Sequence, residues 1–493
     1  MLIKFVMFVV AIFLVTIMFS YQFGIVTRMK GLVAMNKILK SIIIASTFMS
    51  VNANELVDKI EKFKWENIDV TYIQDDKFPT YNVTIFFADG AIKDGRTKGV
   101  TKMMFDLLES GTNRFSLNEI ADNLEFYGVS TSSNVTHEFS SYSYNGLAKD
   151  IIPTTKKICH IFRDAVYPDQ ELSKAKKSLT AQRQNLVSDH GELASTAFRT
   201  ISLKGTPYVS DVRGRLADIK RIKRSYLQSR LKYFRDDVKK KVYITGPRSI
   251  LKIKNIVTNE CGFDSKASFV RNLDTEVKEI KKFNPEKPLI HFVEVPKANQ
   301  AQVRAGIYMA KKEDPGFENL EFMSQYLGGG FTSILVKELR TKRGLTYSAW
   351  ATAGMQKDYG RSILSTFTKE ETVNQMVQEV IKILKDNSQA ENISMEEIEK
   401  VRKAVKGGFA FQFQKPSSFM RQLVSLDNSQ VDIKRFLEYT NSVDKITQED
   451  VAKTIYSAFP YDKVQIVVLG DKKMMNALKK IAKIKVYSYK NFL

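Results

Sequence analysis

The segment Glu338–Tyr347 holds the side chains of this chain that are best suited to chemistry. It reads E-L-R-T-K-R-G-L-T-Y, and a run of three glycines precedes it: Gly328, Gly329 and Gly330. Arg340 and Tyr347 lie seven residues apart and supply a guanidinium and a phenol, which are both hydrogen-bond donors. Glycines let the backbone turn tightly and approach another chain closely. The pattern predicts a ligand-binding segment whose role in any reaction depends on a partner.

A plainer interpretation of the same residues stays open. Arg340 could be an exposed cation at a helix end, where the helix dipole favours positive charge, and Tyr347 could be an ordinary strand aromatic. An Arg and a Tyr at this spacing are common by chance. The surrounding segment and its glycine run favour the functional interpretation. Lys342 and Arg343 are expected to be solvated charges.

A second segment has the outline of a metal-binding helix without the ligands. Gly99–Thr112 reads G-V-T-K-M-M-F-D-L-L-E-S-G-T and has helical spacing. A protonated lysine cannot ligate zinc, and a phenyl ring cannot act as a base. The chain has four histidines, no two of them three or four residues apart: His137, His160, His190 and His291. We therefore predict no metal site on this chain.

Both segments resemble insulinase/pitrilysin-type zinc metallopeptidases, and the resemblance covers about residues 60–475. Active members carry H-x-x-E-H in the frame G-L-x-H-x-x-E-H-M-x-F-x-G-T, where two histidines bind zinc and the glutamate activates water. In that frame Lys102, Phe105 and Asp106 stand at the histidine, glutamate and histidine positions. The third ligand is a downstream glutamate, but Ser178–Arg183 has no carboxylate. The resemblance thus implies a bacterial-type subunit that cannot cut by itself.

The C-terminal half keeps the family pattern better. By resemblance, Arg340 donates to a substrate carbonyl and Tyr347 donates to the oxyanion of the tetrahedral intermediate, in trans, at the zinc of a partner chain. The three glycines belong to the same substrate-binding segment. The resemblance implies a non-catalytic, substrate-binding subunit in a heterodimer with a zinc-bearing peptidase of the same family, acting on peptides. The zinc is expected on the partner and no cofactor on this chain.

Two alternative functions remain open. A peptide-binding or scaffolding protein would use the same surface with no role in catalysis. An autonomous zinc peptidase would need a metal site that the sequence does not show.

The order of predicted elements indicates an internal duplication and an α+β fold. The closing helix and strand of the two halves superimpose at a constant offset of about 224 residues, which places Val242 on Ile466 and Gly246 on Gly470. We expect two homologous sandwich domains, each with an antiparallel-rich sheet covered by helices. The resemblance implies the metallopeptidase/LuxS-like form of this fold. The predicted boundaries are an N-terminal peptidase-like domain over 54–272, a linker over 273–288, a C-terminal domain over 289–475 and a tail over 476–493.

The N-terminus reads as a targeting signal. Residues 35–53 have a short basic start, an apolar core and the small-x-small ending of a secretory signal peptide. Residues 1–34 are either a hydrophobic extension that anchors the chain in a membrane or an over-extended start, and the second interpretation is favoured. We expect an exported, periplasmic protein.

Composition excludes little else. The net charge is +22, but the lysines are spread along the chain and no nucleic-acid-binding signature accompanies them. We therefore expect no nucleic-acid partner. Cys159 and Cys261 could form one disulfide or remain buried thiols.

Overall fold

A computed structural model describes residues 57–263, 281–413 and 415–493. The chain divides into two units, Met1–Val57 and Asp58–Leu493, and the second unit contains the strands and helices described in this section. The predicted extension 1–34, the signal peptide 35–53 and residues 273–280 of the predicted linker lie outside the described residues.

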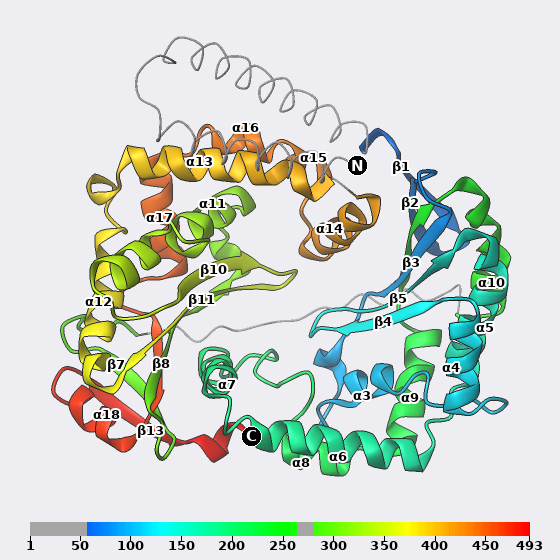
Figure 1. The fold of residues 1–493 in the computed structure, drawn as a ribbon, viewed down its shortest axis with the longest axis horizontal. Helices are drawn as coiled ribbons and strands as arrows, with labels where there is room; N and C mark the ends of the chain where they lie inside the picture. The colour runs from blue at the N-terminus through cyan, green and yellow to red at the C-terminus, as the bar shows by residue number, and fades with distance from the viewer. Residues whose placement is uncertain (1–56, 264–280, 414) are drawn as a thin grey trace, which may run out of the picture. The chain divides into compact units, whose positions relative to one another are not determined.

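The first half of the sequence builds a six-stranded mixed sheet in the order β1-β2-β6-β3-β5-β4 (Figure 1). Only β2 and β6 pair in parallel, and the other neighbours are antiparallel. The strands are β1 (Ile60–Trp65), β2 (Ile68–Gln74), β3 (Thr80–Phe87), β4 (Ser130–Val135), β5 (Ser140–Leu147) and β6 (Lys240–Gly246).

The second half builds a seven-stranded sheet whose main path is β10-β11-β8-β12-β7-β13, with β9 paired to β11. Its strands are β7 (Leu289–Glu294), β8 (Gln300–Gly306), β9 (Tyr308–Ala310), β10 (Ala349–Met355), β11 (Tyr359–Lys369), β12 (Gln465–Gly470) and β13 (Lys483–Ser488). The five strands β7-β12-β8-β11-β10 match β2-β6-β3-β5-β4 of the first sheet in order and direction, whereas the outer strands differ, since β1 is antiparallel to β2 and β13 is parallel to β7. In that match β6 corresponds to β12, the two strands that the sequence offset aligned.

Helices accompany both sheets, so the predicted α+β fold with two related halves is confirmed (Figure 1). The first half contains α3 (Val100–Asp106), α4 (Leu117–Phe126), α5 (Ile151–Asp164), α6 (Asp169–Asn185), α7 (His190–Ser202), α8 (Leu216–Arg221), α9 (Arg224–Asp236) and α10 (Lys254–Asn259). The second contains α11 (Phe317–Gly328), the π-helix η5 (Val336–Lys342), α12 (Val373–Asp386), α13 (Met395–Phe409), α14 (Pro416–Ser429), α15 (Ile433–Leu437), α16 (Tyr439–Val443), α17 (Gln448–Ala458) and α18 (Lys472–Leu478).

Helix α7 belongs to the first half by sequence but packs on the second sheet. Its apolar face, including Leu193 and Phe198, forms one buried cluster with Val467 and Leu469 of β12. Arg304 of β8 fixes the start of the helix, donating from Nη2 to the Gly191 carbonyl at 2.8 Å and from Nε to Ser195 Oγ at 3.1 Å. Since successive side chains of a strand point to opposite faces, α7 closes one face of the second sheet.

Helix α14 makes the reciprocal crossing. It starts 226 residues after α7 and contacts β6 of the first sheet. There the Tyr243 hydroxyl donates to Asp427 at 2.6 Å, and Lys241 lies 3.3 Å from the same carboxylate. The two crossing helices thus occupy corresponding places in the duplicated halves, one with an apolar contact and the other with a polar one.

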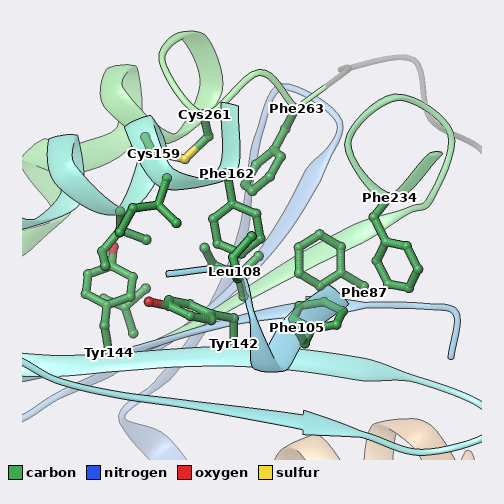
Figure 2. Packing of buried hydrophobic residues seen from close by; sticks show 14 of the residues in the cluster. Phe87, Phe105, Leu108, Tyr142, Tyr144, Cys159, Phe162, Phe234, Cys261 and Phe263 are labelled. Atoms are coloured by element: carbon green, nitrogen blue, oxygen red, sulfur yellow. A yellow bond between two sulfur atoms is a disulfide. The ribbon is translucent and has the colours of Figure 1, made fainter. Parts of the chain in front are cut away.

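The core of the first half is rich in aromatic rings and contains a disulfide (Figure 2). Cys159 of α5 is bonded to Cys261, and both residues are fully buried. Phe162, one turn along α5, packs edge-on against Phe263 with ring centroids 5.5 Å apart. The disulfide ties α5 to the last described residues before the second half.

The C-terminal residues 476–493 take part in the second sheet. Strand β13 pairs in parallel with β7 along its whole length, and Phe492 is buried with the α7 cluster. Among residues 57–263, 281–413 and 415–493, no helix is both long and apolar enough to cross a bilayer.

Replacing Phe198 by Ala should destabilise the protein by about 3–5 kcal/mol, because it opens a cavity between α7 and the second sheet. The measurement is the free energy of unfolding from urea denaturation. Phe126→Ala is the matched control, since that ring is 81% exposed, and it should shift the free energy by less than about 0.5 kcal/mol. Equal effects of the two changes would contradict the docking of α7.

Candidate functional site

Helix α3 contains the segment that resembles a zinc-binding frame in sequence, and its first turn is tightly held. Asp94 accepts hydrogen bonds from the backbone N–H groups of Gly99 at 2.9 Å and Thr101 at 3.0 Å. Gly99 has φ of 91°, and a side chain there would meet the Arg213 carbonyl. Glycine is therefore required at this position, which explains why the frame survives although the ligands do not.

The three degenerate positions on α3 do not face a common site. Lys102 and Asp106 form an ion pair with each other one turn apart. Phe105 is buried in the core, with its ring centroid 5.7 Å from that of Phe87 and 5.4 Å from that of Phe234 (Figure 2). A lysine paired with the Asp106 carboxylate and a ring used for packing do not fit a zinc ion.

The stretch Ser178–Arg183, where the third ligand would be sought, presents an arginine. Arg183 is 2% exposed, donates to the Gly214 carbonyl at 2.6 Å and lies 2.9 Å from Asp211. Burial raises the pKa of the Asp211 carboxyl, but Arg199 and Arg183 outweigh it and hold that pKa well below its usual range. Asp211 is thus a charged partner for arginines. No group of three or more potential metal ligands occurs in the part of the chain that the structure describes.

In the second half, the glycine run is shaped first by packing inside this chain. Gly328 ends α11, and a Cβ there would collide with the backbone nitrogen of Ala351 in β10. The Ala353 N–H of the same strand donates to Ser324 of α11 at 3.0 Å. Helix α11 therefore covers the outer edge of β10, as edge strands are commonly protected. By contrast, a Cβ at Gly330 would meet nothing within 4 Å.

Arg340 lies on the π-helix η5, which covers Val336–Lys342. Seven residues of η5 have the wide π form, which is rare and often found at functional sites. Arg340 is exposed, and its guanidinium carbon lies 5.5 Å from the ring centroid of Phe331. No ion pair or hydrogen bond of its side chain is formed with the residues that the structure describes.

The neighbouring cations differ from Arg340 because each pairs with a carboxylate, although the Lys342 side chain remains 54% exposed, as expected of a solvated charge. Glu338 accepts from Lys342 at 2.7 Å and from Arg343 at 2.7 Å. Arg343 also lies 3.1 Å from Glu379. Burial raises the pKa of Glu338, but hydrogen bonds from Lys342 and Arg343 exceed that effect and lower it overall. Lys342 and Arg343 thus each have a carboxylate partner.

Tyr347 lies in the turn before β10, which begins at Ala349. Its side chain is 79% exposed. Backbone hydrogen bonds fix the turn before Tyr347. The Gly344 N–H donates to the Arg340 carbonyl at 3.0 Å, and the Leu345 N–H donates to the Leu339 carbonyl at 2.9 Å. Arg340 and Tyr347 are therefore brought to neighbouring turns of backbone with both polar groups directed to solvent.

Comparison with known proteins agrees with this geometry. Residues 241–405 match the family described as peptidase M16 inactive domain. A Helicobacter pylori protein named non-peptidase homolog YmxG is 22% identical over 356 residues, which are 70% of this chain and 80% of that protein. This chain is therefore similar to proteins of the peptidase M16 family. The matches fit a non-catalytic role.

Solved structures show the same fold in other M16-like chains. The peptidase M16 inactive domain from Pseudomonas fluorescens superimposes with a TM-score of 0.72 at 18% identity, covering 84% of this chain and 98% of that one. A structure titled as a protease from Helicobacter pylori gives a TM-score of 0.68 at 15% identity, with 84% and 99% covered. At such identities the likeness concerns the fold alone.

Sequence reasoning missed two residues beside the M16-type Arg/Tyr segment. Phe331 is 82% exposed and Trp350 is 42% exposed. Both are aromatic residues at the borders of the segment, and their types and positions were visible in the sequence. Exposure could not be predicted, because a phenylalanine after a helix and a tryptophan in a strand are more often buried.

Restoring the zinc motif should not restore zinc binding. In the triple variant Lys102→His, Phe105→Glu, Asp106→His, the new carboxylate replaces a core ring and the third ligand is still missing. We expect a loss of about 3–5 kcal/mol in unfolding free energy, from the lost ring and the buried polar group, and no bound zinc by elemental analysis.

The double variant Lys102→His, Asp106→His is the control. It removes only a partly exposed ion pair, so its unfolding free energy should change by less than about 1 kcal/mol. A stable triple variant that binds stoichiometric zinc would show that Phe105 does not fix the helix in its present register.

Proposed function

We propose that this chain is the non-catalytic, substrate-binding subunit of an M16-type zinc metalloendopeptidase. A separate zinc-bearing chain of the same family would perform hydrolysis, and Arg340 and Tyr347 would complete its site in trans. The zinc belongs to that partner in this proposal, since α3 of this chain does not fit the ion.

One observation supports the proposal: within residues 57–263, 281–413 and 415–493, Arg340 has no carboxylate partner while Lys342 and Arg343 are paired. An exposed guanidinium can donate to a peptide carbonyl, and an exposed phenol can donate to a developing oxyanion. Both groups point outward from a backbone held by internal hydrogen bonds. Such donors are useful only when another molecule brings the acceptor.

The disulfide supports export to an oxidising compartment. Cys159 and Cys261 are bonded across a separation of 102 residues, and disulfides persist mainly in periplasmic or extracellular proteins. We therefore propose a periplasmic location, with the mature chain starting near Asn54. The alternative function, a peptide-binding or scaffolding protein without a catalytic role, uses the same surface, and the name of the Helicobacter relative favours it.

Tyr347→Phe in the assembled heterodimer should lower peptide turnover by about 10²–10³-fold, because it deletes one oxyanion donor and no packing contact. Turnover and complex formation are measured on the same preparation, and assembly should be unchanged. Tyr226→Phe is the control, since Tyr226 is another exposed tyrosine, on α9. Undiminished turnover in Tyr347→Phe would rule out the oxyanion role.

Native mass spectrometry with metal analysis, on the chain isolated from its host, tests the partnership itself. We expect a heterodimer with one zinc, and a mature chain that starts near Asn54 and is lighter by two hydrogens for the disulfide. A zinc-free monomer or homodimer would favour the binding-protein alternative. A full-length mass with reduced cysteines would contradict export.

A further inference from the structure

A cavity of about 230 Å³ lies between α4 and α5 of the first half (Figure 1). Its walls come from these two helices, from the loop before α4 and from Glu260 at the end of α10. The disulfide ties the last of these walls to α5, because Cys261 follows Glu260 and is bonded to Cys159 (Figure 2). The cavity therefore belongs to the packed structure of the first half.

The floor of the cavity is apolar. Ile120, Leu124 and Ile161 line it, and all three are members of the buried core of the first half. Phe115 adds a ring that is 38% exposed and lies edge-on to the ring of His160, with the centroids 5.4 Å apart. A ligand that covers these side chains removes apolar area from water, so the floor favours a ligand with an apolar body.

His160 holds this wall in place. Its Nε2 lies 3.1 Å from Thr112 Oγ1, and its Nδ1 lies 2.8 Å from the Asp164 carboxylate. Burial lowers the pKa of His160, so the ring is neutral at pH 7. Both ring nitrogens have partners within the chain, and His160 therefore orients Phe115 and adds no charge to the cavity.

The rim of the cavity is cationic. One carboxylate, that of Glu260, lines the cavity together with four cations: Arg114, Lys156, Lys157 and Arg163. A concave site with apolar walls and an excess of one charge raises the local concentration of ions of opposite charge. The cavity thus combines features that suit a molecule with an apolar body and a negative charge.

Two of the four cations have carboxylate partners in the chain. Arg163 lies 2.9 Å from Asp164, and Lys156 lies 4.0 Å from Glu260. A carboxylate already offsets the charge of each, so these two cations contribute less to the binding of an anion.

Lys157 and Arg114 differ from that pair. Lys157 donates to the amide oxygen of Asn123 at 2.5 Å and lies 5.8 Å from the ring centroid of Tyr127, and neither partner is charged. The Arg114 side chain forms no ion pair or hydrogen bond within the part of the chain that the structure describes. A guanidinium and an ammonium at one rim can both donate charge-assisted hydrogen bonds to a carboxylate.

From this arrangement we propose that the cavity binds a small monocarboxylate with an apolar body, of the class of short-chain fatty acids. Arg114 and Lys157 bind the carboxylate, and the hydrocarbon chain lies on the apolar floor. The inference goes beyond the proposed function and does not depend on it, because the cavity lies in the first half and Arg340 and Tyr347 lie in the second.

The size and the floor of the cavity select this class. A volume of about 230 Å³ holds roughly eight water molecules, or a ligand with as many heavy atoms. It is smaller than the pockets of about 300–1,000 Å³ that hold drug-sized ligands, so a peptide of several residues does not fit. A wholly polar anion such as phosphate would leave its oxygens against the apolar floor without hydrogen bonds, which is unfavourable.

The test is isothermal titration calorimetry of the purified full chain with three compounds: hexanoate, acetate and 1-hexanol. Hexanoate carries both the charge and the apolar chain, acetate lacks the chain, and hexanol lacks the charge. We expect hexanoate to bind at least about ten-fold more tightly than either of the others, since each lacks one of the two contacts. Absence of hexanoate binding would refute the site.

Four variants locate the ligand. Arg114→Gln and Lys157→Gln should each weaken hexanoate binding by about ten-fold and leave hexanol binding unchanged. Phe115→Ala should weaken the binding of both compounds. Lys177→Gln is the matched control, because Lys177 is an exposed lysine that lines a different cavity, on α6, and it should leave hexanoate binding unchanged.

Three further outcomes would overturn the proposal. Equal binding of hexanol and hexanoate would show that the rim does not recognise the charge. Equal binding of acetate and hexanoate would show that the floor takes no part. Hexanoate binding that persists in both Arg114→Gln and Lys157→Gln would place the ligand elsewhere on a chain whose net charge is +22.

Discussion

The architecture depends on a reciprocal exchange of helices between the two halves of the chain. Helix α7 carries Phe198 and Leu193 onto β12, and α14 brings Asp427 to Tyr243 of β6. Each sheet thus receives a helix encoded in the other half of the sequence. Burying an apolar helix face such as that of α7 is worth several kcal/mol. Arg304 fixes the position of α7 on the sheet, because its buried guanidinium donates to the Gly191 carbonyl and the Ser195 hydroxyl, and a shift of the helix would leave those donors unpaired.

The two halves share a fold but differ in how the residues of their two candidate segments are packed. In the first half, the helix that could have carried a metal is committed to the core through Phe105, and its exposed face is closed by the ion pair of Lys102 and Asp106. In the second half, Gly328 draws α11 against β10, and the residues after it remain at the surface. In the first half, the residues at the ligand positions of the frame are used for packing and ion pairing. In the second half, the side chains of Arg340 and Tyr347 remain exposed. This asymmetry is what the proposed division of labour with a zinc-bearing partner would require.

Charge pairing distinguishes residues that the sequence makes look alike. Arg340, Lys342 and Arg343 fall within four positions, yet among the described residues Glu338 pairs with the last two, Glu379 also pairs with Arg343, and neither pairs with the first. The reason is local geometry: on η5 the carboxylate of Glu338 is turned toward Lys342 and Arg343, and Phe331 occupies the space beside Arg340. An interpretation from residue types alone could not separate these three cations. The exposure of Phe331 and Trp350 could not be predicted from the sequence either, because exposure depends on neighbours that are distant along the chain.

The sequence by itself determined the class of fold, the internal duplication and the absence of zinc ligands from the family frame, because these depend on periodicity, spacing and residue type. It also located the Arg340 and Tyr347 segment. Only the tertiary structure decided that α7 crosses to the other sheet, that η5 is a π-helix and that Cys159 and Cys261 are bonded. An amphipathic pattern specifies that a helix has an apolar face and leaves open which surface will cover it. That choice is made by the free energy of burial summed over the whole molecule, to which residues hundreds of positions apart contribute.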